Sequence, residues 1–241
     1  MKLNVREASK VLAVSESQLY RWVESGEIPC YLVNHQPLFS PAELLEWATA
    51  RRLPVSTGLF ETGDEENGAR PPGLADALAR GGVHDGIRVG DRESVLRAVV
   101  ERLPLADPRD GEDLLQILLA REALGSTGIG EGIAIPHVRS PLVFPGTPAS
   151  VMLCFLDTPV PFAAIDGQPV HTIFALVSPT IRGHLQLLSR LSLALLDPGF
   201  KAAVLRRAGA EELIEEARRV DAALAEKPTE KHTETAAPRR T

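Results

Sequence analysis

The chain has 241 residues and a net charge of −6, and its length favours one large domain or two modest ones. Hydrophobic residues make up 44% and charged residues 24%, which excludes a wholly disordered or fibrous chain. No apolar run approaches the roughly 18 residues that a membrane-spanning helix needs, and the charged N-terminus lacks the apolar region of a signal peptide. The two cysteines, Cys30 and Cys154, lack the spacing of metal ligands. We therefore expect a cytoplasmic protein with no membrane insertion and no bound metal.

Residues 1–52 are predicted to form a small helical unit. Apolar spacing indicates a first helix that opens at Val5, and Ser15 is the predicted N-cap of a second helix that stops near Gly26. Two short extended stretches follow, and a third helix is predicted to begin at Ser40-Pro41, with proline at its first position. The order is that of a helix-turn-helix with a hairpin wing.

Three stretches, residues 5–22, 26–31 and 40–44, carry a resemblance to the winged helix-turn-helix of the excisionase and MerR-like families. The resemblance implies that the second helix lies in the major groove of DNA. The residues that would then face the bases are Ser17, Gln18 and Arg21.

The charges of this unit oppose a simple DNA-binding interpretation. Residues 1–52 carry six cations and six anions, and the expected wing, residues 31–39, contains no lysine or arginine. Neutralisation of phosphates supplies most of the non-specific affinity for DNA, so a DNA reader normally has a basic face. Two alternatives stay open: a DNA-binding module, and a protein-interaction or dimerisation unit.

Composition divides the rest of the chain into three parts. Residues 53–72 are rich in glycine, proline and acidic residues and are predicted to be a flexible acidic linker, and residues 225–241 a disordered tail. Residues 73–224 mix helical apolar spacing with two continuous apolar runs, 149–156 and 171–177, that are typical of buried strands. We expect an α/β domain whose mixed sheet is covered by helices.

The glycine-rich segment 125–132 invites a nucleotide-binding interpretation, which fails. Gly125 and Gly130 have the spacing of a phosphate-binding loop, but Glu131 stands where that motif needs lysine. The motif also runs from strand to loop to helix, whereas here the predicted order is helix, loop, strand. No cofactor is therefore expected.

What this segment does resemble is the EIIA domain of the fructose, mannitol and nitrogen-regulatory class of the phosphoenolpyruvate-dependent phosphotransferase system. The resemblance rests on an Arg-Glu helix end at 121–122, Gly-Ser-Thr-Gly-Ile-Gly at 125–130 and Ile-Pro-His at 135–137. It extends through 158–162, 166–170, 174–177 and 183–185, and so covers essentially all of 73–224. It implies the fold of a type 2 EIIA domain.

The family places its phosphoryl-accepting histidine in Ile-Pro-His, which here is His137. An unperturbed imidazole is mostly neutral at pH 7 and offers a nitrogen lone pair as nucleophile. Because Pro136 fixes the backbone where the predicted strand ends, we expect the ring to be presented to solvent. By the same resemblance Arg121 would stabilise the phosphoryl charge, and His184 would donate a hydrogen bond from the first turn of a helix, where free amides favour anions.

The predicted site also includes two hydroxyl groups, and the sequence departs from the family pattern directly after the histidine. Ser126 and Thr127 are possible further phosphate contacts. Val138 follows the histidine where the family often has a small residue, which affects the expected shape of the docking face, and Arg139 comes next as a candidate contact to the phosphate or to a docking partner.

The sequence thus predicts a phosphorelay protein that accepts a phosphoryl group on His137 from a phosphocarrier protein. No motif identifies the downstream acceptor or regulated protein. Because a helix-turn-helix unit is fused to the EIIA-like part, a regulatory role is favoured over sugar uptake. One alternative is a DNA-binding transcription regulator whose EIIA-like domain senses the state of the phosphotransferase system. Another is a regulator that binds only protein.

Overall fold

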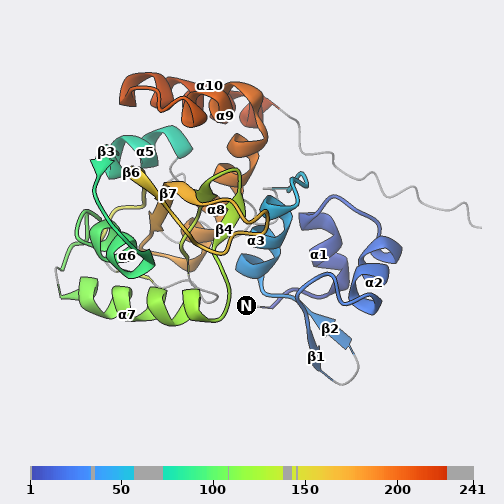
Figure 1. Cartoon of the computed structure of the whole chain (residues 1–241). Helices are drawn as coiled ribbons and strands as arrows, with labels where there is room; N and C mark the ends of the chain where they lie inside the picture. Colours follow the sequence, from blue (N-terminus) through green and yellow to red (C-terminus); the bar gives the residue numbers. More distant parts are fainter. Residues whose placement is uncertain are drawn as a thin grey trace, which may run out of the picture.

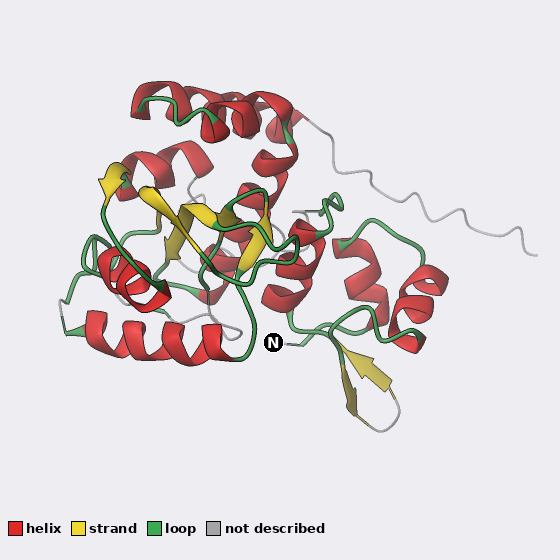
Figure 2. Ribbon diagram, in the orientation of Figure 1, coloured by secondary structure: helices red, strands yellow, loops and turns green. Residues whose placement is uncertain are grey.

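A mixed five-stranded sheet lies between two groups of helices, and a smaller unit of helices and one hairpin lies beside them (Figures 1 and 2). The computed structural model describes residues 2–33, 36–56, 73–107, 109–137, 143–144 and 146–226. The expected α/β class, a mixed sheet covered by helices with a helix-turn-helix unit at the N-terminus, is confirmed. Within the described residues, no helix is long and apolar enough to cross a membrane.

The sheet has the order β3-β6-β7-β5-β4. Its strands are β3 (Val83–Ile87), β4 (Gly128–Gly130), β5 (Ile133–Ala134), β6 (Ser150–Val160) and β7 (Val170–Val177). The pairs β3–β6 and β5–β7 are parallel, whereas β6–β7 and β4–β5 are antiparallel. β7 coincides with its predicted apolar run to within one residue, whereas β6 continues beyond the predicted run to Val160. β3 and β4 were not predicted, because both are short and rich in glycine or polar residues.

Helices cover both faces of the sheet. They are α5 (Leu74–Gly81), α6 (Arg92–Val100), α7 (Asp110–Ala123), α8 (Ile181–Leu196), α9 (Pro198–Leu205) and α10 (Ala210–Glu226). Successive side chains of β6 alternate between the faces: Val151, Leu153 and Phe155 pack with α5, α8, α9 and α10. Met152, Cys154 and Leu156 pack with α6 and α7 on the other side. A strand buried on both faces needs apolar residues at every position, which explains the unbroken run; burial also raises the pKa of the Cys154 thiol to about 12.

The N-terminal unit comprises α1 (Val5–Val11), α2 (Glu16–Glu24), β1 (Tyr31–Val33), β2 (Gln36–Leu38) and α3 (Pro41–Ala50). The Asn4 side chain and Glu7 form a capping box at α1, and the Ser15 side chain accepts from the amide of Gln18 at α2, as a good N-cap does. β1 and β2 form an antiparallel hairpin in the position of the expected wing.

The N-terminal unit shares a hydrophobic core with the larger part of the chain. Leu44, Leu45 and Ala48 of α3 belong to the same buried cluster as Leu188 and Leu191 of α8. α3 lies along α8, so the unit is packed against the sheet domain by one whole helix (Figure 1).

The segment after α3 departs from the expected linker at its start. Val55 is buried, and the amide of Ser56 donates to the carbonyl of Val11 at 2.7 Å. Residues 53–56 therefore pack on the first helix instead of forming a free tether. Residues 57–72 lie outside the described residues, as do residues 227–241 beyond the end of α10.

The glycine-rich segment forms the tight β4–β5 hairpin. Gly130 and Gly132 have φ of 97° and 72°, a region that L side chains rarely adopt, and a Cβ on Gly132 would collide with the ring of His171. Gly130 and Gly132 therefore allow the backbone to make the turn of this hairpin.

Candidate functional site

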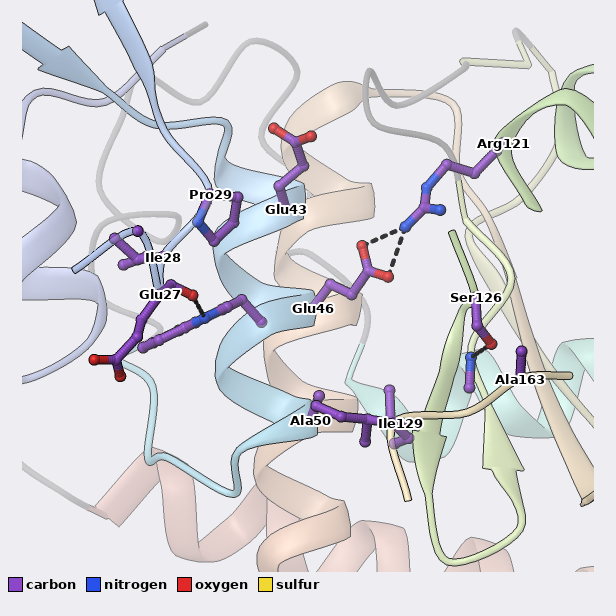
Figure 3. Close-up of a pocket in the computed structure, with 14 residues that line it drawn as sticks. Glu27, Ile28, Pro29, Glu43, Glu46, Ala50, Arg121, Ser126, Ile129 and Ala163 are labelled. Carbon is purple, nitrogen blue, oxygen red and sulfur yellow. Dashed lines mark hydrogen bonds and ion pairs between the residues drawn. The ribbon is translucent and has the colours of Figure 1, made fainter. Parts of the chain in front are cut away.

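Arg121 lies in the last turn of α7 and is 8% exposed. Its Nη1 donates to the carbonyl of Gly125 at 2.8 Å, and its Nη2 donates to both carboxylate oxygens of Glu46, each at 2.6 Å. Figure 3 shows Glu46 reaching from α3 of the N-terminal unit to Arg121. The guanidinium is thus held between a loop carbonyl of its own domain and a carboxylate of the neighbouring unit.

His137 follows β5 and directs its ring to the same carboxylate. Its Nδ1 lies 2.8 Å from the carbonyl oxygen of Ile135. A carbonyl can only accept, so Nδ1 carries the proton and Nε2 is left with the lone pair. Nε2 lies 3.5 Å from Oε2 of Glu46. Arg121 and His137 therefore meet at one point in space, and Glu46 occupies it.

Burial, opposed by Glu46, lowers the pKa of His137, so the ring is neutral at pH 7. The expectation that the ring is presented to solvent is wrong, because His137 is only 3% exposed. One contact that covers the ring is that with Glu46 of α3, which the sequence did not reveal.

His184 lies in α8 and is also 3% exposed. Neither of its ring nitrogens has a hydrogen-bond partner within the described part of the chain. Burial lowers its pKa to about 3, with the nearby His137 as the second cause. The predicted free amides are not at His184 itself: its own N–H donates to the carbonyl of Thr180, and the Thr180 hydroxyl caps the amide of Gly183. The imidazole, and not the backbone of this residue, is what His184 can offer a ligand.

The two predicted hydroxyl contacts differ in their surroundings. The hydroxyl of Thr127 donates to Oε2 of the buried Glu122 at 2.7 Å, and its amide donates to the same oxygen at 3.1 Å. Burial raises the pKa of Glu122, and these hydrogen bonds oppose the rise. Thr127 is therefore engaged in fixing the loop after α7, whereas Ser126 lines the cleft beside Arg121. Val138 and Arg139 lie outside the described residues.

A cleft of about 490 Å³ separates the N-terminal unit from the β4 side of the sheet domain next to this site. Its walls include Glu43, Glu46 and Trp47 from α3 on one side, and Arg121 and Ser126 on the other (Figure 3). The site therefore lies at the junction between the two parts of the molecule.

Glu46 is the site residue that sequence reasoning missed, since it was counted only as one anion among six. A signal was present in the sequence of α3, where seven of ten residues are Pro, Ala, Leu or Trp. A helix that is apolar on more than one face must be covered on more than one side. A unit of about fifty residues cannot do so alone, so the pattern indicates contact with a second domain.

The predicted DNA-contacting residues lie on α2, away from this junction (Figure 1). Ser17 and Arg21 are exposed, and Gln18 is partly buried. The wing has no cation among its described residues and instead exposes Tyr31, Leu32 and Val33. The surface of the unit thus combines a polar second helix with an apolar wing.

Comparison with known families gives two matches. Residues 80–218 match the family described as phosphoenolpyruvate-dependent sugar phosphotransferase system, EIIA 2, which is more than half of the chain. Residues 3–52 match a family of helix-turn-helix domains.

Individual proteins are similar to this chain over part of its length. The nitrogen regulatory protein of Pseudomonas aeruginosa is 41% identical over 111 residues, which are 45% of this chain and 70% of that protein. The nitrogen regulatory protein of Escherichia coli is 43% identical over 86 residues, 35% of this chain and 52% of the relative. Among solved structures, the nitrogen regulatory protein IIA-Ntr of Neisseria meningitidis has a TM-score of 0.46 and 31% identity, covering 56% of this chain and 91% of that one.

Proposed function

Since the chain belongs to the EIIA type 2 family of the phosphoenolpyruvate-dependent sugar phosphotransferase system, we propose that it is a regulatory phosphorelay protein that accepts a phosphoryl group on His137. The observation that carries this proposal is the convergence of two groups on one point. The fork of Arg121 and Nε2 of His137 both face the position of the Glu46 carboxylate. A cationic donor beside a nucleophilic nitrogen is what a phosphoryl group needs.

The chemistry follows from the protonation state of His137. Because Nδ1 donates to Ile135, the lone pair of Nε2 attacks the phosphorus carried by a histidine of the phosphocarrier protein. The N–P bond of the donor breaks, its ring takes back the electron pair, and a new N–P bond forms at Nε2. Phosphoryl transfer depends on positioning and on charge stabilisation more than on covalent assistance from the protein.

Arg121 and His184 are assigned to the phosphoryl oxygens. The Gly125 carbonyl holds one arm of the Arg121 guanidinium, so the other arm is fixed in the direction of His137. A buried ring without described partners is unfavourable unless a ligand supplies them, and the phosphoryl oxygens would satisfy His184. Ser126, on the cleft wall, is a further candidate, and Thr127 supports the loop.

A regulatory role is favoured over sugar transport by the second unit of the chain. The relatives from Pseudomonas aeruginosa and Escherichia coli are named nitrogen regulatory proteins, and this chain adds a helix-turn-helix unit whose α3 reaches the proposed site. The phosphoryl donor is then a phosphocarrier protein, and the output is a change in the partners of the chain.

Phosphorylation with mapping of the modified residue tests the proposal. The full chain is incubated with phosphoenolpyruvate and the two general phosphotransfer proteins, and we expect one acid-labile phosphoryl group on His137. His137→Ala should abolish the label, whereas His84→Ala, at a partly buried histidine on β3, should keep it. An equally labelled His137→Ala variant would contradict the proposal.

A second candidate function, DNA binding, is favoured by the exposure of α2. Ser17 and Arg21 are free to approach a major groove while α3 is packed on α8. The neutral charge of residues 1–52 implies weak non-specific affinity. DNA binding would therefore need specific base contacts from α2.

Selection of bound duplexes from a random-sequence pool at low salt, followed by fluorescence anisotropy with the enriched sequences, tests this candidate. We expect measurable binding to the enriched duplexes with a shallow salt dependence, because few phosphates are neutralised, and a roughly tenfold loss in Arg21→Ala. Lys10→Ala, at an exposed cation on α1, is the matched control and should bind nearly as the parent does. No affinity at low salt, or equal losses in both variants, would refute DNA binding through α2.

A further inference from the structure

Glu46 stands where the proposed phosphoryl group would be. Its two oxygens accept from Nη2 of Arg121 at 2.6 Å each, and Oε2 lies 3.5 Å from Nε2 of His137. Both contacts are ones that a phosphoryl group bonded to Nε2 would make. The Glu46 carboxylate therefore occupies the position of the proposed phosphoryl group as a smaller oxyanion.

A phosphorylated His137 and this placement of Glu46 exclude each other. Three phosphoryl oxygens around Nε2 need the volume that the carboxylate fills. A phosphoryl group also carries about two negative charges at neutral pH, and like charges at such a short distance repel strongly in a buried site. Glu43, one turn earlier on α3, is a second carboxylate that acts on the His137 ring.

The position of α3 is maintained by contacts outside the site. The Thr49 hydroxyl donates to the Ser192 hydroxyl of α8 at 2.6 Å, and both groups are buried. Beyond the end of α3, Arg52 pairs with Glu131 of the β4–β5 turn at 2.6 Å, and Lys201 of α9 pairs with the same carboxylate. These contacts, with the shared core, form an interface along the whole of α3.

We propose that α3 is the resting occupant of the phosphoacceptor site, and that its docking through Glu46 and the phosphorylation of His137 are mutually exclusive. The proposal rests on the proposed function of His137. It follows that a phosphocarrier protein must displace α3, and that phosphorylation releases the N-terminal unit. Because linkage is reciprocal, any partner that binds the released unit makes His137 easier to phosphorylate.

Accessibility of His137 tests the covering without any phosphoryl donor. The full chain is treated with diethyl pyrocarbonate, which modifies unprotonated imidazole, and modification of His137 is followed by mass spectrometry. We expect Glu46→Ala to react about tenfold faster than the parent, because the carboxylate no longer fills the space in front of Nε2 and the open state becomes more populated. Glu24→Ala, at an exposed glutamate on α2, is the control and should react as the parent does. Equal rates in the parent and Glu46→Ala would overturn the covering by α3.

Phosphorylation is then measured in the same variants with the phosphotransfer proteins. We expect Glu46→Ala to be labelled at least about tenfold faster than the parent, and Glu46→Gln, which keeps the shape without the charge, to be intermediate. Equal labelling rates in the parent and Glu46→Ala would overturn the exclusion. Faster modification of Glu46→Ala by diethyl pyrocarbonate with no phosphoryl label in any variant would uphold the covering and refute the proposed function instead.

Hydrogen–deuterium exchange of the parent chain tests the release. After phosphorylation, amides of α3 should exchange faster than in the unphosphorylated protein, because their helix has left α8. Amides of β6 and β7, in the centre of the sheet, serve as the internal control and should not change. Unchanged exchange in α3 of the phosphorylated chain would overturn the proposal.

Discussion

Replacing Arg121 by glutamine is expected to lower the rate of phosphoryl transfer to His137 about 10²- to 10³-fold. The guanidinium is aimed at the point in front of Nε2 by its bond to Gly125, and it is there before the phosphoryl group arrives. Preorganised charge of this kind acts strongly in a buried site, because no reorganisation is needed as the transition state forms. Glutamine keeps a polar end but loses the charge and the fork.

The same substitution removes the partner of Glu46, and loosening of α3 would by itself accelerate transfer. The measurement is therefore made in the Glu46→Ala background, where that effect is already present, and single-turnover rates are compared in a double-mutant cycle. Arg97→Gln removes a cation of α6 that pairs with Glu93 of the same helix, and should change the rate little. Equal rates in Glu46→Ala with and without Arg121 would rule out the assigned role.

The fold was largely predictable because its elements carry strong local patterns. The unbroken apolar runs of β6 and β7 and the helical spacing of α7 and α8 reflect burial within one domain. β3 and β4 escaped prediction for a physical reason. β4 is Gly-Ile-Gly, and β3 contains His84, Asp85 and Gly86, so neither has the alternation or β-branched content of a strand. Pairing with β6 and β5 creates these strands.

The candidate site was predictable only within the EIIA-like part. The resemblance to the EIIA family implied that Arg121 and His137 lie in one site, and the structure brings both to one carboxylate. The covering by Glu46 depends on the packing of α3 against α8, a contact between segments about 140 residues apart that leaves no local pattern. The exposed ring expected at His137 was therefore wrong for a reason that lies in the N-terminal unit.

The titration of His184 is expected to have the second large effect, a loss of folding stability in mild acid. Burial lowers its pKa from 6.5 to about 3 in the folded chain, so between these values the unfolded chain binds a proton at this ring and the folded chain does not. The free energy of unfolding is therefore highest above pH 6.5. It falls as the pH is lowered, by up to about 1.4 kcal/mol per pH unit, or roughly 2 kcal/mol by pH 5. The lowered pKa of His137 acts in the same direction.

Urea unfolding at pH 7.5 and pH 5.0 measures this loss, and variants separate it from the titration of carboxyl groups. His184→Gln should lose about 2 kcal/mol less than the parent between the two values, because glutamine does not titrate. His84→Gln, at the partly buried histidine of β3, is the control and should behave as the parent does. An equal loss in His184→Gln and the parent would show that this ring is already solvated.

Phosphorylation of His137 should reduce the same loss. A phosphoryl group beside His184 favours the protonated ring, and the departure of α3 lets water reach it, so both effects raise its folded pKa towards 6.5. The folded chain then binds the proton that only the unfolded chain bound before, and the difference in the free energy of unfolding between pH 7.5 and pH 6.0, measured at values that spare the acid-labile phosphoryl group, shrinks. A phosphorylated chain with an unchanged loss would mean that the phosphoryl group does not approach His184.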